Sequence, residues 1–187
     1  MNGEGETNVA DKLSVGIEAP NFDLSSTEEV VLMLRDEVPR MAVVLYFFAD
    51  PGSERVRQDL TALAAAQHSL AEKRAVILGV SRTKLMPLKQ AQREMNLGFP
   101  LLYDDRDFSA SYGIEAPEEG EPEPALFVID RDQKVAWMAN PLQSIGKALE
   151  EVSGVLQNQP SQTYHYPAKV VNRVVNWWVN RVRPRTA

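Results

Sequence analysis

Two apolar runs joined by an amphipathic stretch constrain the fold of this chain more than any other feature of its sequence. Residues 41–49, MAVVLYFFA, form an almost unbroken β-branched and aromatic run, which predicts a central strand buried on both faces. After the Asp-Pro-Gly sequence of residues 50–52, apolar side chains recur near helical spacing. A second buried run, AVILGVS, follows at 75–81. A strand, a helix and a second strand in this order predict a βαβ unit.

The turn after the first run contains two residues that suit a helix start. Asp50 is a good N-cap and Pro51 suits the first helical position, so we expect Asp50 to cap the helix. A ligand contact or a general base is the alternative role for Asp50. Ser53 is expected to fill the first turn, with anion binding as its alternative role.

The remaining pattern extends this unit at both ends. It predicts, in chain order, a strand or hairpin over 15–26, a helical turn or a strand over 28–38, a helix over about 85–96, an extended segment over 99–105, a turn of helix over 108–114, a hairpin of strands 125–129 and 134–139, and a helix over 144–157. This is the element order of the thioredoxin fold. The sequence therefore predicts an α/β protein with a central mixed sheet flanked by helices, followed by a C-terminal amphipathic helix.

Composition divides the chain into four parts. We expect a flexible N-terminal arm at 1–14, a folded domain at 15–157, a linker at 158–166 and a basic helix at 167–187. The first residues have no apolar core, so they do not resemble a signal peptide, and no run of about 18 apolar residues predicts a membrane span. A cytoplasmic location, with peripheral membrane attachment as a possible addition, is the expectation.

The chain of 187 residues contains no cysteine. This excludes disulfides, cysteine zinc sites and a thiolate nucleophile. The two histidines, His68 and His165, lack the spacing of a metal site. The net charge of -6 argues against nucleic acid as a partner. No cofactor and no metal are expected.

Four stretches resemble the peroxiredoxin and redoxin family, also known by alkyl hydroperoxide reductase C and thiol-specific antioxidant. VGIEAPNFDL resembles the family's G-x-x-A-P-x-F-x-L opening, and VVLYFFADPGSERVRQDLTAL resembles its strand, active-site loop and helix. FPLLYDDRDFSASYGI and ALFVIDRDQKV resemble the late blocks in order and spacing. Together the four stretches cover about residues 15–155.

The resemblance implies a catalytic cysteine that this chain does not have. In the family a cysteine lies at the N-terminus of the first long helix, where Asp50-Pro51-Gly52-Ser53 stands here and Ser53 takes the cysteine's place. The family's arginine before the late strand aligns with Pro124, which resembles the cis-proline of thioredoxins. The site is therefore degenerate at Asp50, Pro51, Gly52, Ser53 and Pro124, and no peroxidase activity is expected.

Other polar residues have simpler interpretations. His68 is expected on the surface of the first long helix, about four turns from Ser53, so the two cannot form a catalytic pair. Asp104, Asp105 and Asp107 lack the glycine and the final glutamate of a calcium loop. The acidic residues of the Pro-rich loop are expected to be a solvated charge run, with partner docking as the alternative; they are Glu118, Glu119, Glu121 and Glu123.

The C-terminal segment has the clearest functional pattern. Residues 167–187 carry five basic residues and no acid, whereas the rest of the chain has a net charge of -11. The pattern predicts an amphipathic, basic helix with two tryptophans. The residues expected to contact a partner or a membrane are Lys169, Arg173, Val174, Trp177, Trp178, Arg181, Val182, Arg183 and Arg185.

Three surfaces suit such a helix: a groove on an acidic protein, an anionic membrane, or the acidic body of the chain itself. The sequence favours the protein partner. The functional hypothesis is therefore a non-catalytic adaptor or assembly subunit, a pseudoenzyme that docks through its C-terminal helix. The alternative is an antioxidant or oxidoreductase whose chemistry has changed at the Asp50–Ser53 loop.

Overall fold

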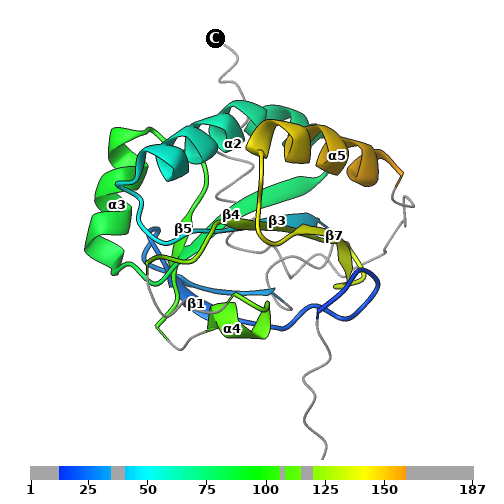
Figure 1. The fold of residues 1–187 in the computed structure, drawn as a ribbon, viewed down its shortest axis with the longest axis horizontal. Helices are drawn as coiled ribbons and strands as arrows, with labels where there is room; N and C mark the ends of the chain where they lie inside the picture. Colours follow the sequence, from blue (N-terminus) through cyan, green and yellow to red (C-terminus); the bar gives the residue numbers. More distant parts are fainter. Residues whose placement is uncertain (1–12, 35–40, 106–107, 115–119, 159–187) are drawn as a thin grey trace, which may run out of the picture.

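The computed structural model describes residues 13–34, 41–105, 108–114 and 120–158. Seven strands form one mixed sheet in the order β2-β1-β5-β4-β3-β6-β7, as Figure 1 shows. The strands are β1 (Asp23–Ser26), β2 (Val31–Met33), β3 (Ala42–Phe47), β4 (Ala75–Ser81), β5 (Leu101–Tyr103), β6 (Ala125–Ile129) and β7 (Val135–Ala139). The helices are α2 (Glu54–Glu72), α3 (Leu85–Glu94), α4 (Phe108–Ser111) and α5 (Ile145–Gln157).

The predicted βαβ unit is confirmed. β3 pairs in parallel with β4 from Ala42↔Ala75 to Phe47↔Val80, and α2 connects them. β6 pairs with β3 on its other side in antiparallel register. Every residue of β3 and of β4 is buried, which explains why both strands read as continuous apolar runs rather than alternating ones.

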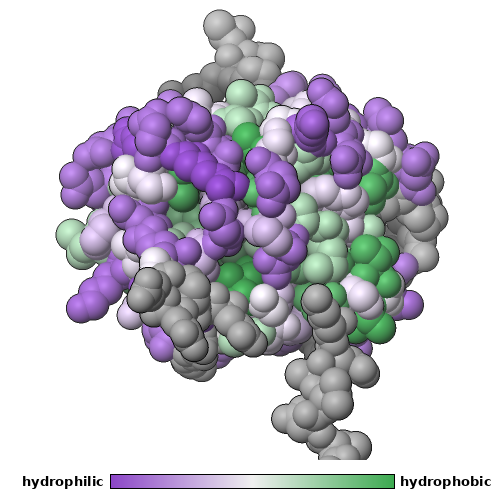
Figure 2. All heavy atoms as spheres, viewed as in Figure 1, coloured by the Kyte–Doolittle hydropathy of each residue, from purple (hydrophilic) through white to green (hydrophobic). Residues whose placement is uncertain are grey.

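The two faces of the sheet carry different layers. The α2, α3 and α5 helices supply apolar side chains to one core, and the β1–β2 hairpin and the residues around α4 pack into the other. In Figure 1, α2 and α5 lie together above the sheet and the short α4 lies below it. In the same view, the left part of the molecular surface is predominantly hydrophilic (Figure 2). The predicted central mixed sheet flanked by helices is confirmed.

Most predicted boundaries agree with the structure to within a few residues. The open choice at 28–38 is settled in favour of a strand for its described part, because Val31–Met33 pair with β1 and bury Leu32. Most of the expected arm at 1–14, almost all of the linker and the whole of the expected helix at 167–187 lie outside the described residues. In the part of the chain that the structure describes, no helix has the length and apolarity to cross a bilayer.

Aromatic rings fill the core beneath the carboxyl end of β3. The rings of Phe47 and Phe127 meet edge to face, with centroids 5.7 Å apart, and Tyr112 meets Phe127 in the same way at 5.0 Å. The Tyr112 hydroxyl donates to the carbonyl oxygen of Pro20 at 3.0 Å. Edge-to-face pairs contribute about 0.5–1.5 kcal/mol beyond the burial of their area. This cluster fixes the end of β3 from which the next loop starts.

Phe127→Ala tests the importance of this cluster. We expect the free energy of unfolding to fall by about 3–5 kcal/mol, because the substitution removes a fully buried ring and leaves a cavity among the remaining aromatic side chains. Urea denaturation followed by circular dichroism measures the change. Met86→Ala is the control, since Met86 is 74% exposed and should change stability by no more than about 0.5 kcal/mol. A loss below about 1 kcal/mol for Phe127→Ala would contradict the account.

Candidate functional site

A cavity of about 390 Å³ opens where the parallel strands β3 and β4 end. Ligands of open α/β sheets bind at the carboxyl ends of the strands, so this cavity is the candidate site. Its lining comes from the end of β3, the loops after β3 and β4, the α4 region and the segment before β6. The lining residues are Phe47, Phe48, Ala49, Asp50, Arg82, Thr83, Ser109, Ile114, Glu121, Pro122 and Glu123.

The loop between β3 and α2 holds its own shape. The Asp50 carboxylate accepts a hydrogen bond from the Gly52 amide at 2.8 Å, and the Ser53 amide donates to the Asp50 carbonyl oxygen at 3.2 Å. A Cβ at Gly52 would lie 3.2 Å from Asp50 Oδ2, so the absence of a side chain leaves room for the carboxylate. The loop thus turns by means of an Asp side chain bonded to the backbone two residues on.

The expectation that Asp50 caps the helix is wrong. The N-cap of α2 is Ser53, which has an extended backbone (φ -67°, ψ 140°) and whose Oγ accepts from the Val56 amide at 3.3 Å. Asp50 is committed to its own turn, so the helix begins three residues later than expected. For the same reason Pro51 is a buried residue of the turn and not the first helical residue.

The cap defines what Ser53 does in this structure. Its hydroxyl serves an otherwise unsatisfied amide of the first helical turn, which stabilises a helix by about 1 kcal/mol.

His68, also on α2, has a 72% exposed side chain whose Nε2 lies 3.5 Å from Glu72 Oε1, so the prediction of a surface residue is confirmed.

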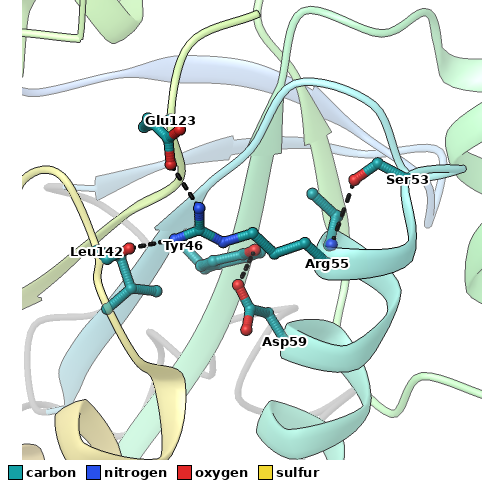
Figure 3. Close-up of polar contacts among 7 residues, drawn as sticks. Tyr46, Ser53, Arg55, Asp59, Glu123 and Leu142 are labelled. Atoms are coloured by element: carbon teal, nitrogen blue, oxygen red, sulfur yellow. Dashed lines mark hydrogen bonds and ion pairs between the residues drawn. The ribbon is translucent and has the colours of Figure 1, made fainter.

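Arg55 connects the helix start to two distant segments (Figure 3). Its Nη1 lies 2.5 Å from Glu123 Oε2, in the segment before β6, and its Nη2 donates to the carbonyl oxygen of Leu142, in the loop before α5. The sequence analysis missed this residue. A signal was present, since a cation in the first turn of a helix is unfavourable for the helix dipole unless it has a partner elsewhere.

Pro124 does not have the bond of the thioredoxin proline that it was expected to resemble. The cis bond in the described residues precedes Pro141, and Glu123–Pro124 is not cis. The Pro124 carbonyl oxygen accepts from the Leu142 amide at 2.7 Å, and the next residue, Ala125, pairs with Phe47 in the sheet. The extended chain thus continues through Pro124 directly into β6.

A buried polar pair lies on the helix side of β3 and joins this strand to α2. The Tyr46 hydroxyl donates to Asp59 Oδ2 at 2.9 Å, and both residues are almost inaccessible (Figure 3). Burial raises the pKa of Asp59 above its ordinary value, although the Tyr46 hydrogen bond and the Arg55 charge oppose the shift. Burial also raises the pKa of Tyr46, and the neighbouring carboxylate adds to that effect.

The structure describes some of the other predicted acidic residues and places them differently. Asp104 is buried and accepts hydrogen bonds from the Phe108 amide at 2.7 Å and the Ser109 amide at 2.8 Å, which organises the start of α4. No cluster of three potential metal ligands occurs in the described ranges. Glu121 and Glu123 line the cavity. The predicted residues outside the described ranges are Asp107, Glu118, Glu119, His165 and all those of the 167–187 segment.

Replacing Asp59 tests its buried environment. The pKa of Asp59 is raised in the folded state, so the native protein binds more protons than the unfolded chain between the ordinary value of 3.8 and the raised value. Folding stability contributed by this group therefore falls as pH rises through that window. We expect the stability of Asp59→Asn relative to the parent to increase as the pH rises above the ordinary value of 3.8, and urea denaturation at several pH values measures it.

Met86→Ala, which changes an exposed side chain that does not titrate, is the control and should leave the pH dependence of stability unchanged. The account of Asp59 is wrong if the stability difference between Asp59→Asn and the parent is the same at every pH, or if it moves in the opposite direction.

Comparison with known proteins places this architecture. A family model described as "AhpC/TSA family" matches residues 15–138. The chloroplastic 2-Cys peroxiredoxin BAS1 of Hordeum vulgare is 25% identical over 154 residues, which cover 76% of this chain and 73% of that protein.

Solved structures agree in fold. The peroxidoxin BcpB of Mycobacterium tuberculosis superimposes with a TM-score of 0.73 at 20% identity, covering 80% of this chain and 99% of that one. A peroxiredoxin Q of Xanthomonas campestris gives a TM-score of 0.67 at 19% identity, covering 76% and 96%. At these identities the likeness establishes the fold, which is thioredoxin-like with a seven-stranded mixed sheet flanked by helices, as the sequence predicted.

Proposed function

This chain belongs to the AhpC/TSA family, and we propose that it acts by binding, as an adaptor or assembly subunit, rather than by thiol chemistry. The chain contains no cysteine, so it lacks the thiolate that peroxidase chemistry in this family requires. The fold and the cavity are nevertheless present. A protein that keeps the fold and the cavity but lacks the reactive sulfur can still bind a partner.

The cap at Ser53 is the observation that supports this proposal most directly. A serine hydroxyl is barely ionised at neutral pH, and oxygen cannot pass through the reversible sulfenic acid and disulfide states of a cysteine. Here the Ser53 hydroxyl accepts from the Val56 amide, and the Asp50 carboxylate accepts from the Gly52 amide. Each group is engaged with backbone rather than with the other, which does not favour altered chemistry at the Asp50–Ser53 loop.

The charge distribution supports the choice of a protein partner. Residues 167–187 have five basic residues and no acid, two tryptophans and a row of valines at helical spacing. Tryptophan and arginine are the residues that contribute most to protein interfaces. The tail is proposed to bind an acidic groove on a partner protein, while the thioredoxin-like body positions it.

We expect the purified chain to consume hydrogen peroxide or an organic hydroperoxide no faster than buffer in the presence of a thiol reductant, because no atom of the protein cycles between thiolate and sulfenic acid. A spectrophotometric peroxidase assay measures the rate. The Ser53→Cys variant is the comparison, since it places a thiol at the start of α2. Sustained turnover by the cysteine-free chain would contradict the proposal.

A second experiment distinguishes a protein partner from a membrane. With vesicles containing phosphatidylserine, we expect the full chain to remain in the supernatant after centrifugation. In affinity purification the full chain should retain a partner protein in stoichiometric amount. The double variant Trp177→Ala, Trp178→Ala should lose that partner protein. His165→Ala is the matched control in the same region. Sedimentation with the vesicles that weakens as salt rises would show instead that the tail binds the membrane surface.

A further inference from the structure

The guanidinium of Arg55 lies where three segments of the chain meet (Figure 3). Its Nη1 pairs with Glu123, in the segment before β6, at 2.5 Å, and its Nη2 donates to the carbonyl oxygen of Leu142, in the loop before α5. These two segments are also joined to each other, because the Leu142 amide donates to the carbonyl oxygen of Pro124 at 2.7 Å. One side chain of α2 thus holds the entry to β6 together with the loop that leads into α5.

A buried carboxyl group lies one helical turn further along α2. Asp59 follows Arg55 by four residues, and residues at this spacing are neighbours on one face of a helix. Asp59 is 6% exposed, and its Oδ2 accepts from the Tyr46 hydroxyl of β3 at 2.9 Å. A charge in such a buried position acts more strongly than a charge in water. An ionised Asp59 therefore attracts the guanidinium that holds the two segments.

In the described part of the chain, two groups act on the Asp59 carboxyl: the Tyr46 hydroxyl from β3 and the Arg55 guanidinium from α2 itself. β4 also packs against α2 and has no charged residue. α5 packs against α2 through buried apolar side chains, and its charged residues are exposed: Lys147, Glu150 and Glu151. Burial raises the pKa of Asp59, so this carboxyl loses its charge at a higher pH than an exposed aspartate does.

We propose that Asp59 and Arg55 form a pH-sensitive latch. The ionised Asp59 carboxylate holds the Arg55 guanidinium against Glu123 and the Leu142 carbonyl, and uptake of a proton by the carboxyl removes this attraction and loosens the junction of the two segments. Because the segment before β6 lines the cavity, loosening it changes the rim of the cavity. The latch goes beyond the proposed binding function and does not depend on what residues 167–187 bind.

The Leu142 amide reports on this junction, because its hydrogen bond to Pro124 joins the two segments. Its protection from hydrogen exchange is measured by NMR on the full chain labelled with ¹⁵N. At neutral pH we expect Asp59→Asn to lower this protection at least about twofold, which corresponds to the loss of a charge pair between neighbouring helical residues. Asparagine keeps an oxygen that accepts from the Tyr46 hydroxyl, so the substitution chiefly removes the charge.

Two controls separate the latch from a general effect. Glu54→Gln removes an exposed carboxylate from the first turn of α2 and should leave the protection of the Leu142 amide unchanged. The Ser26 amide, which donates to the Val30 carbonyl oxygen in the β1–β2 hairpin, is the internal reference, because global destabilisation would lower its protection as well.

A double variant tests whether the effect passes through the guanidinium. Arg55→Gln should itself lower the protection of the Leu142 amide, and adding Asp59→Asn to Arg55→Gln should lower it no further.

A pH titration tests the same latch without a substitution at Asp59. It is made with the Glu123→Gln variant, because the Glu123 carboxylate also takes up protons and pairs with Arg55. The carboxyl ¹³C resonance of Asp59 follows its protonation. The protection of the Leu142 amide, corrected for the intrinsic exchange rate at each pH, should fall along the same curve as the pH is lowered. Adding Arg55→Gln should raise the pKa of Asp59, since the cation that favours the ionised carboxyl is gone, and should abolish this fall.

The proposal is overturned if Asp59→Asn leaves the protection of the Leu142 amide unchanged, lowers that of the Ser26 amide by the same factor, or acts equally in the Arg55→Gln background. It is also overturned if the protection of the Leu142 amide does not follow the titration of Asp59. None of these results bears on the absence of peroxidase activity, and peroxide turnover by the chain would leave the latch untouched.

Discussion

The burial of β3 on both faces is the constraint on which the rest of this structure depends. Its alternate side chains enter two different cores, Leu45 and Phe47 on one side and Val44 and Tyr46 on the other. Parallel pairing with β4 and antiparallel pairing with β6 fix it laterally. The loop that leaves the end of this strand leads to α2, and the cavity opens there, lined by residues of that loop and of the segment before β6.

At this place a peroxiredoxin-type scaffold remains without its reactive sulfur. The start of α2 is held by Ser53 as a cap and by Arg55, which reaches Glu123 and the Leu142 carbonyl. Much of the exposed Arg55–Glu123 attraction is screened by solvent, so its main effect is to orient the segment before β6. That segment brings Glu121 and Glu123 to the cavity. The same contacts that hold the helix start thus hold the segment that brings two carboxylates to the cavity.

The sequence predicted the fold well because burial dominates it. The continuous apolar runs of β3 and β4 are compatible with few structures other than strands buried on both faces. The β6–β7 hairpin was predicted to within one residue. The prediction of Asp50 as the cap residue was wrong because Asp50 and Ser53 both suit a helix start, and only the geometry of the turn decides between them. The Arg55–Glu123 contact joins residues 68 positions apart, which no local pattern reveals. The roles of residues 167–187 stay predictions.

The central claim is that Ser53 is a structural cap and not a nucleophile. Treatment of the full chain with a fluorophosphonate, which modifies activated serine hydroxyls, followed by intact-mass and peptide mass spectrometry, tests this claim most directly. The account predicts no adduct on Ser53, because its hydroxyl caps the first turn of α2, where it accepts a hydrogen bond from the Val56 amide. A stoichiometric adduct on Ser53 would show an activated serine and contradict the account.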